Sequence, residues 1–235
     1  MDRLHRTRLL LGDAAVEKLR SATVMVVGCG AVGSFAIECL ARAGVGNIVI
    51  VDFDTVAQSN INRQLFALES SLGMPKVDVA AARIHDINPN TCVHPINAFW
   101  DDKIDIDIIP DVVIDAIDNV SSKIALYKWC ASRNIVFISS MGAARKTKPD
   151  CVRVSKISDT TVCPLAAKIR SEIRGMNLPD FDVVFSTERA APQITPGKVF
   201  GSIVTVTGTF GIYMANWAID KIIGPNTTII TRKEK

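Results

Sequence analysis

Short runs of β-branched apolar residues alternate along the chain with longer segments whose apolar residues have helical spacing. The first run, Thr23–Val27, stops at a glycine and is followed by a helical pattern over Ala31–Gly44. A second apolar run covers Asn47–Asp52. This order predicts a βαβ unit. Because neighbouring positions of both strands are apolar, we expect parallel strands covered by helices on both faces.

The same alternation continues to about residue 142. Helices are expected at Pro75–Ile87 and Ser121–Arg133, and further strands are expected at Thr91–Ile96, Asp111–Asp118 and Asn134–Ser140. Strands and helices that alternate in this way form an open, mostly parallel, doubly wound sheet. The predicted fold class is therefore α/β and Rossmann-like.

Beyond residue 142 the alternation weakens. The elements expected there are apolar runs at Cys151–Ile157 and Asp182–Ser186, a helix that begins at Pro164 and a long apolar helix at about Ser202–Ile223. No repeat and no long polar linker divides the chain. We expect a single domain over residues 1–235, with its core at about 21–142 and extra strands and helices at about 143–224.

The composition is that of a folded globular protein. Of the 235 residues, 48% are hydrophobic and 22% are charged. A chain of this length buries a large core and does not need disulfides or metal ions to be stable. The net charge of +3 is too small to indicate a dedicated nucleic-acid-binding protein. Four local basic clusters are present, and a solvated surface is the ordinary explanation for each: residues 4–8, 145–148, 168–174 and 232–235.

The cysteines and the apolar segments bear on the location of the protein. No two of the six cysteines are separated by two residues, so the paired ligands of a structural zinc site are absent. The chain shows no secretory signal peptide, and we expect a cytoplasmic protein with reduced thiols. The uncharged segment Ile203–Ile219 is short for a membrane span and favours a helix buried on more than one side, as at a subunit interface.

The sequence GCGAVG places Gly28, Gly30 and Gly33 between a predicted strand and a predicted helix. This spacing allows a tight turn, close approach of the backbone to a phosphate and close packing of the helix on the strand. Asp52, at the end of the next strand, is placed to accept hydrogen bonds from ribose hydroxyls. Together these features indicate that the core binds a nucleotide.

Polar residues after the second strand bear on which nucleotide is bound. The loop and the start of the following helix carry Asp54, Asn60, Arg63, Gln64 and Lys76. They all follow the carboxyl end of a strand, where ligands of this fold lie. A triphosphate needs such a cluster, whereas a hydride-transferring dehydrogenase gains nothing from it. The sequence therefore favours ATP chemistry over NAD chemistry.

Asp118 lies at the same predicted edge of the sheet. A carboxylate there can hold Mg²⁺ against phosphate oxygens. The alternative is a helix cap, because either Asp118 or Asn119 precedes the helix at Ser121. Position alone does not separate the two roles, and the nearby Arg63 and Lys76 favour the metal.

These motifs resemble the ThiF-like, ubiquitin-activating-type adenylating enzymes, which activate a carboxylate with ATP. The segments that carry the resemblance are VVGCGAVGS, IVIVDFDTV, SNINRQLFAL and VIDAIDN. Within this family, NRQ followed by GMPKVDVAAARIHDINP, PLAAKIR and DVVFSTE is similar to the tRNA threonylcarbamoyladenosine dehydratase branch. The similarity extends from about residue 5 to residue 223.

The resemblance implies an ATP-dependent reaction on tRNA. The carboxylate of the threonylcarbamoyl group on adenosine 37 attacks the α-phosphate of ATP, giving an acyl adenylate and pyrophosphate. A nitrogen of the same modified base then closes a hydantoin ring and expels AMP, with net loss of water. Because this second nucleophile is intramolecular, no catalytic cysteine is required.

The resemblance also implies roles for the candidate residues. Those that contact ATP are Arg63 and Lys76 on the phosphates, Asp118 on Mg²⁺, Gln64 and Asn60 as positioning groups, Asp52 on the ribose, and Asn119 with the three glycines. Asp54 is implied to be structural or to lie near the metal. Arg8 aligns with an arginine that related homodimers insert into the neighbouring subunit's ATP site, so a homodimer is expected. A sulfur-relay protein partner and a bound monovalent cation, Na⁺ or K⁺, are left open.

Other functions fit the sequence less well. The first alternative is adenylation of the C-terminus of a ubiquitin-like sulfur-carrier protein, but those relatives commonly carry two CxxC pairs, which this chain lacks. A noncatalytic nucleotide-binding or tRNA-binding module would not need Arg63, Gln64, Lys76 and Asp118 together. The dehydratase interpretation explains both the phosphate cluster and the later motifs.

Three further features stay open. Arg145, Lys146 and Lys148 follow a strand end, where they are placed to contact tRNA phosphates. Cys163 is a candidate for a catalytic cysteine, but a free cysteine is more often a small buried apolar residue. Glu188 is a candidate ligand, helix cap or strut of a loop.

Overall fold

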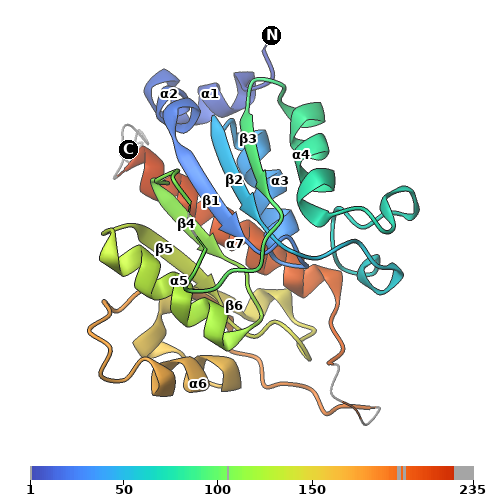
Figure 1. Ribbon diagram of the computed structural model, residues 1–235, viewed down its shortest axis with the longest axis vertical. Helices are drawn as coiled ribbons and strands as arrows, with labels where there is room; N and C mark the ends of the chain where they lie inside the picture. Colours follow the sequence, from blue (N-terminus) through green and yellow to red (C-terminus); the bar gives the residue numbers. More distant parts are fainter. Residues whose placement is uncertain (1, 105, 195–196, 198–199, 225–235) are drawn as a thin grey trace, which may run out of the picture.

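The computed structural model describes residues 2–104, 106–194, 197 and 200–224 (Figure 1). The strands are β1 (Thr23–Val27), β2 (Asn47–Val51), β3 (Cys92–Ile96), β4 (Val112–Asp115), β5 (Val136–Ser140), β6 (Val152–Lys156) and β7 (Asp182–Ser186). The α-helices are α1 (His5–Leu11), α2 (Asp13–Ser21), α3 (Gly33–Ala43), α4 (Lys76–Ile87), α5 (Val120–Ser132), α6 (Pro164–Glu172) and α7 (Val204–Ile223). The short 3-10 helices are η1 (Gln58–Asn60), η2 (Glu69–Ser71), η3 (Pro149–Cys151) and η4 (Ile157–Asp159).

The strands form one seven-stranded sheet in the order β3-β2-β1-β4-β5-β7-β6. Neighbouring strands are parallel except for β6, which runs antiparallel to β7. The chain moves from β1 outward through β2 to β3 and then returns to place β4 on the other side of β1. The strand order therefore reverses between β1 and β4, and ligands of doubly wound folds bind beyond the carboxyl ends of the strands at such a reversal.

Both faces of the sheet are buried. Val24 and Val26 of β1 face a core shared with α3 and α7, whereas Met25 and Val27 face a core shared with α5 and α6. Figure 1 shows α5 in front of the sheet and α7 behind it. The period of two along a strand produces this division, since successive side chains point to opposite faces. The predicted α/β, doubly wound architecture is confirmed.

Two elements differ from the sequence-based expectation. β4 ends at Asp115 rather than at Asp118, because Asp115 Oδ1 accepts the N–H of Ile117 at 3.1 Å and turns the chain. The helix α1 was not predicted, and none of its residues is buried, so the core-facing apolar stripe that identifies a helix is missing. The first difference moves Asp118 from the strand to the loop beyond it.

The uncharged C-terminal helix is α7, and it packs against α3 and across β4 and β5. Its buried face includes Phe210 and Met214, while Ile212 and Tyr213 on the opposite side are 48% and 38% exposed. Among the residues that the structure describes, no helix combines the length and apolarity of a membrane span.

A fully buried ion pair connects α5 to the carboxyl ends of β4 and β5. Lys123 Nζ lies 2.8 Å from Asp115 Oδ2, and both side chains are 0% exposed. The same ammonium donates to Ser139 Oγ at 3.2 Å and to the carbonyl oxygen of Ser140 at 2.8 Å. A lysine has three donors, and all three are used here. Lys123 therefore fixes two strand ends relative to one helix.

A serine and a tyrosine complete this buried network. Ser139 Oγ donates to Asp115 Oδ2 at 2.5 Å and lies 2.6 Å from the hydroxyl of Tyr127. Burial, with the charge of Asp115 as a second cause, raises the pKa of Tyr127 well above its ordinary value, so the phenol keeps its proton. Because the proton of Ser139 is directed to Asp115, Tyr127 donates to Ser139. Every polar atom of the network thus has a partner.

We expect Lys123→Met to lower the free energy of unfolding by about 3–5 kcal/mol, because it leaves the Asp115 carboxylate buried without a counter-charge. The double variant Asp115→Asn with Lys123→Met removes both charges and keeps an acceptor for Ile117, so it should be less destabilised than the single variant. Urea unfolding monitored by circular dichroism measures both. Lys128→Met, at an exposed lysine of the same helix, is the control. An equal effect at Lys123 and Lys128 would contradict the role of the pair.

Candidate active site

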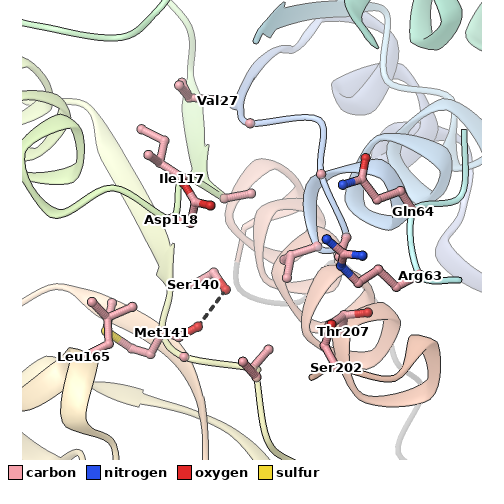
Figure 2. A pocket seen from close by; sticks show the side chains of 18 of the residues that line it. Val27, Arg63, Gln64, Ile117, Asp118, Ser140, Met141, Leu165, Ser202 and Thr207 are labelled. Carbon is pink, nitrogen blue, oxygen red and sulfur yellow. Dashed lines mark hydrogen bonds between the residues drawn. The ribbon is translucent and has the colours of Figure 1, made fainter. Parts of the chain in front are cut away.

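A cavity of about 780 Å³ lies beyond the carboxyl ends of β1, β2, β4 and β5, at the reversal of strand order. One wall consists of the loops after β1 and β2 and the start of α4, and the opposite wall contains the loops after β4 and β5 with the start of α6. Residues before and within the first turn of α7 close one side. Figure 2 shows Arg63 and Gln64 on one wall facing Asp118 and Ser140 on the other.

The glycine turn after β1 approaches its neighbours too closely for side chains. Gly28 has a φ of +98°, and a Cβ atom on it would lie 2.7 Å from the carbonyl oxygen of Ala116 after β4. A Cβ atom on Gly33 would lie 1.8 Å from the carbonyl oxygen of Gly28. These contacts bring the loops after β1 and β4 together at the switch point and place the N-terminus of α3 at the cavity. Gly28 and Gly30 line the cavity, and Gly33 lies behind them.

Asp52 ties the glycine turn to the loop after β2. Its Oδ2 accepts the N–H of Cys29 at 2.6 Å, and its Oδ1 accepts the N–H of Asp54 at 2.8 Å. Carboxylate oxygens have further lone pairs, so Asp52 can still accept from a ligand. Burial raises the pKa of the Cys29 thiol well above its ordinary value, with the charge of Asp52 as a second cause. Cys29 is therefore a thiol rather than a thiolate nucleophile.

Lys76 is held by Asp54. Lys76 Nζ lies 2.8 Å from Asp54 Oδ2, and its side chain is only 7% exposed. The backbone N–H of Lys76 also donates to the carbonyl oxygen of Asp54 at 2.9 Å. The Asp54 carboxylate thus positions an ammonium at the cavity wall, and its expected place near a metal stays a prediction.

Arg63 and Gln64 follow η1 and point into the cavity (Figure 2). Arg63 Nη1 donates to the carbonyl oxygen of Ser59 at 2.7 Å and to Asn62 Oδ1 at 2.9 Å. Asn60 supports the turn, since its Oδ1 accepts the N–H of Ala57 at 3.1 Å. The guanidinium is thus directed by neighbouring oxygen atoms of its own loop and carries no carboxylate partner within hydrogen-bonding distance in the described chain.

Asp118 and Asn119 have different positions. Asn119 Oδ1 accepts the N–H of Ser122 at 3.1 Å and caps α5, and Asn119 lies outside the cavity. Asp118 is exposed and lines the cavity. The cap that the sequence left open between these two residues therefore belongs to Asn119, and the Asp118 carboxylate is available to the cavity.

A metal ion at this site would have few protein ligands. Within the described part of the chain, no group of three His, Cys, Asp or Glu side chains is arranged to hold a metal. Magnesium in nucleotide sites is commonly bound by one or two carboxylates together with phosphate oxygens and water. Of the carboxylates that line the cavity in the described chain, Asp52 and Asp54 already have protein partners, so Asp118 fits that pattern best. The lining does not fit a dedicated protein-only metal site.

Two buried polar atoms on the cavity wall were not predicted from the sequence. Trp100 Nε1 and Ser122 Oγ have no hydrogen-bond partner among the described residues, and both residues line the cavity. A buried polar atom without a partner costs about 1–3 kcal/mol, so we expect an enclosed water molecule to satisfy these atoms. Phe53 and Phe99 also line the cavity, with ring centroids 5.1 Å apart. An apolar surface with a few polar atoms suits a nucleobase.

Glu188 is the strut of the loop after β5. Its carboxylate accepts the N–H groups of Thr147 and Lys148, each at 2.9 Å, and the hydroxyl of Thr147 at 3.0 Å. Lys146 Nζ donates to the carbonyl oxygen of Glu188. Desolvation raises the pKa of Glu188, but the donated backbone hydrogen bonds outweigh it and the net shift is downward.

The three basic residues of this loop, Arg145, Lys146 and Lys148, differ in exposure, and their contact with tRNA stays a prediction. Lys146 is 3% exposed and is bound to Glu188, so it does not present its charge to solvent. Lys148 is exposed, whereas Arg145 is half-buried and lines the cavity. Lys146 differs from its neighbours because Glu188, which is distant in sequence, binds this loop and folds it back on itself.

Arg8 and Cys163 lie in different parts of the structure relative to the cavity. Arg8 lies on α1, at the other end of the sheet from the cavity, and pairs with Asp13 at 2.7 Å and Asp2 at 3.0 Å (Figure 1). It does not line the cavity of its own chain. Cys163 is buried at the start of α6 and lines the cavity wall, as expected for a small apolar residue.

Comparisons with known proteins agree with this geometry. The model of the ThiF family matches residues 3–233. The chain is 45% identical over 187 residues to the tRNA threonylcarbamoyladenosine dehydratase of Bacillus subtilis, covering 78% of this chain and 74% of that protein. It superposes on the crystal structure of the Escherichia coli tRNA N6-threonylcarbamoyladenosine dehydratase in complex with ATP with a TM-score of 0.88 and 35% identity, covering 94% and 93% of the two chains.

One further relative has a different activity. The molybdopterin-synthase adenylyltransferase of Haemophilus influenzae is 41% identical over 130 residues, which cover 54% of this chain and 53% of that protein. This similarity is limited to about half of each chain, whereas the similarity to the dehydratases extends over most of both chains.

We expect the stabilising effect of Glu188 to depend on pH. Because its pKa in the folded protein lies below the ordinary value of 4.5, the contribution is present above that pH and is lost as the pH falls through the lowered value. The difference in unfolding free energy between the wild type and Glu188→Gln should therefore be largest near neutral pH and shrink in acid. Urea unfolding over a pH series measures this, with Glu172→Gln, at an exposed glutamate, as the control. A difference that stays constant with pH would show that the carboxylate charge is not involved.

Proposed function

The chain belongs to the ThiF family, and from this premise we propose that it catalyses the ATP-dependent cyclisation of threonylcarbamoyladenosine at position 37 of tRNA. The overall change is a dehydration of the modified base to its hydantoin form. The observation that carries the proposal is the assembly of Arg63, Lys76 and Asp118 around one cavity in a chain that superposes on an ATP-bound dehydratase.

The first chemical step is attack of the threonylcarbamoyl carboxylate on the α-phosphate of ATP. A bond forms between a carboxylate oxygen and phosphorus, the bond to the bridging oxygen breaks, and pyrophosphate leaves. Negative charge grows on the phosphate oxygens during this displacement. Arg63 and Lys76 stabilise that charge, and because their partners already hold them at the cavity wall, little reorganisation is needed when the charge develops.

The remaining ATP contacts follow from the walls of the cavity. Asp52 accepts from the ribose hydroxyls, Gln64 and Asn60 position the phosphates, and the amides at the start of α3 face them. Asp118 would hold Mg²⁺, which neutralises charge on the phosphates when it is bound. The rings of Phe53 and Phe99 provide an apolar surface for the nucleobase.

The second step closes the ring within the substrate. A nitrogen of the modified base attacks the activated carbonyl carbon, AMP leaves, and no acyl group is passed to the protein. Holding both reacting groups in one molecule supplies the proximity that another enzyme would gain from a covalent nucleophile. This agrees with the buried, protonated state of Cys29 and with the apolar burial of Cys163.

The alternative function is adenylation of the C-terminus of a ubiquitin-like sulfur-carrier protein. The first half-reaction would be the same, because both substrates present a carboxylate to ATP. The similarity to an adenylyltransferase over about half of the chain favours this function less than the nearly full-length similarity to dehydratases. A cytoplasmic location and a sulfur-relay protein partner stay predictions.

We also propose that the enzyme is a homodimer in which Arg8 completes the partner's ATP site. Arg8 lies far from the cavity of its own chain, so it can serve a site only through another subunit. The next two residues on α1, Leu9 and Leu10, are 75% and 77% exposed. Exposed leucines beside a charged residue are typical of a surface that a partner covers.

The direct test is mass spectrometry of nucleosides from tRNA bearing threonylcarbamoyladenosine after incubation with the protein, ATP and Mg²⁺ at mildly acidic pH. The modified nucleoside should lose the mass of one water. Arg63→Ala and Asp118→Ala should each reduce the rate by at least about 100-fold, because each removes a group that stabilises charge in the transition state. Arg42→Ala, at an exposed arginine of α3, should leave the rate unchanged.

A different outcome would support the alternative function. If the nucleoside mass does not change, and ATP–pyrophosphate exchange appears only when a ubiquitin-like carrier protein is added, then the substrate is a protein C-terminus. Exchange that depends on the modified tRNA would instead show that the tRNA carboxylate is activated.

The subunit arrangement can be tested by complementation. Arg8→Ala and Asp118→Ala homodimers should both be nearly inactive. A mixed dimer contains one site with both residues intact, so co-expression in equal amounts should restore about a quarter of the wild-type activity if subunits associate at random. Mixed dimers that remain inactive, or an active Arg8→Ala homodimer, would contradict the shared site.

A further inference from the structure

The cavity extends beyond the residues assigned to ATP. Its second half is lined by Gly142–Lys146, by Leu165 at the start of α6, and by Phe200 and Ser202 before α7. None of these residues has a role in the ATP contacts described above. A cavity of about 780 Å³ that is shared between two substrates needs a second recognition surface, and this half is where it lies.

Arg145 is held in an unusual conformation at this surface. Its φ is +60°, a value that residues other than glycine and asparagine seldom adopt. Its N–H donates to Gly201 O at 2.8 Å, its carbonyl oxygen accepts from Ala191 N at 2.7 Å, and its Nε donates to Ala191 O at 2.6 Å. Three hydrogen bonds thus hold one arginine between two chain segments. Backbone conformations of this kind concentrate where a side chain must be positioned for a ligand.

Phe200 presents an exposed aromatic ring next to this arginine. The ring is 54% exposed although the residue lines the cavity, and the Arg145 guanidinium carbon lies 5.7 Å from the ring centroid. Phe53 and Phe99 on the ATP side are also exposed, at 55% and 45%, and they contact each other edge to face. Phe200 differs in that a guanidinium rather than a second ring lies over it, and its exposed surface remains available to a planar ligand.

An exposed aromatic ring beside a guanidinium plane is a recognition surface for an unstacked nucleobase. Proteins that bind single-stranded RNA loops stack splayed bases on aromatic side chains and on arginine, and the stacking tolerates modification of the base edge. The opposite half of the cavity holds the phosphate cluster, so a base stacked on Phe200 has room to place its N6 substituent toward that cluster.

We propose that Phe200 and Arg145 form the stacking surface that binds the base of the modified adenosine. The inference rests on the proposed function and adds to it the residues that recognise the RNA substrate. Stacking also limits the orientations of the base, so it favours approach of the ring-closing nitrogen to the activated carbonyl.

The test uses an anticodon stem–loop RNA that bears the modification. Phe200→Ala should raise the KM for this RNA by about 5- to 100-fold, the range found when a stacking aromatic is removed. Phe200→Tyr and Phe200→Trp should stay near the wild type. ATP affinity, measured by calorimetry without RNA, should not change, which also shows that each variant is folded.

Arg145→Gly keeps the backbone conformation because glycine accepts the φ of +60° without strain. The guanidinium and its hydrogen bond to the carbonyl oxygen of Ala191 are lost, while the two backbone hydrogen bonds of residue 145 can remain. This variant should raise the KM for RNA, and Arg145→Lys should restore it incompletely, since an ammonium lacks the planar face. Arg42→Ala is the matched control. Because stacking releases no counterions, the salt dependence of KM should stay the same in Phe200→Ala.

The outcomes separate this inference from the proposed function. If the wild type dehydrates the RNA but Phe200→Ala and Arg145→Gly keep the wild-type KM, the stacking surface is wrong and the function stands. A weaker salt dependence in Phe200→Ala would likewise overturn it, because the contact would then involve phosphates. If the wild type binds ATP but does not dehydrate the RNA, the proposed function fails and this inference fails with it.

Discussion

The buried ion pair between Lys123 and Asp115 is the constraint on which the rest of the site depends. Two charges without access to water are costly to bury unless each is fully paired, and here both are. The pair, with Ser139, sets the distance between the carboxyl ends of β4 and β5 and binds both to α5. The loops that follow these two strands carry Asp118 and residues Gly142–Lys146, so the cavity wall opposite Arg63 and Gln64 starts from positions that this network determines.

The same principle recurs at the cavity itself, where Lys76, Arg63 and Asp52 each have partners that position them. Asp54 holds Lys76, and the carbonyl oxygen of Ser59 directs Arg63. Asp52 accepts two backbone N–H groups that belong to different loops. A site that stabilises growing charge on phosphates works best when its cations do not have to move, and these contacts provide that rigidity before any ligand binds.

The C-terminal segments of the chain form the second half of the cavity. Glu188 folds the loop after β5, and Arg145 joins that loop to the segments around Ala191 and Gly201. Without these cross-connections the sheet would still close an ATP site, because the phosphate cluster comes from the first strands. The added walls make the cavity large enough for a second substrate beside the nucleotide. The proposed division of the chain into a nucleotide part and a substrate part would thus be spatial, within one sheet.

Local patterns determined much of this protein from the sequence alone. Strand and helix periodicity predicted the doubly wound sheet, and the strand Asp182–Ser186 was predicted with its observed limits. The glycine turn, Arg63 and Lys76 were predicted to lie at the ligand-binding edge because each follows a predicted strand closely in sequence, and all of them contribute to the cavity wall. Only the tertiary structure decided that Asn119 rather than Asp118 caps α5, that Lys146 is buried against Glu188, and that Lys123 balances Asp115. These features depend on pairings between distant segments. From sequence alone a charged residue is expected at the surface, because its burial is favourable only when a partner is close in space, and the fold determines that partner.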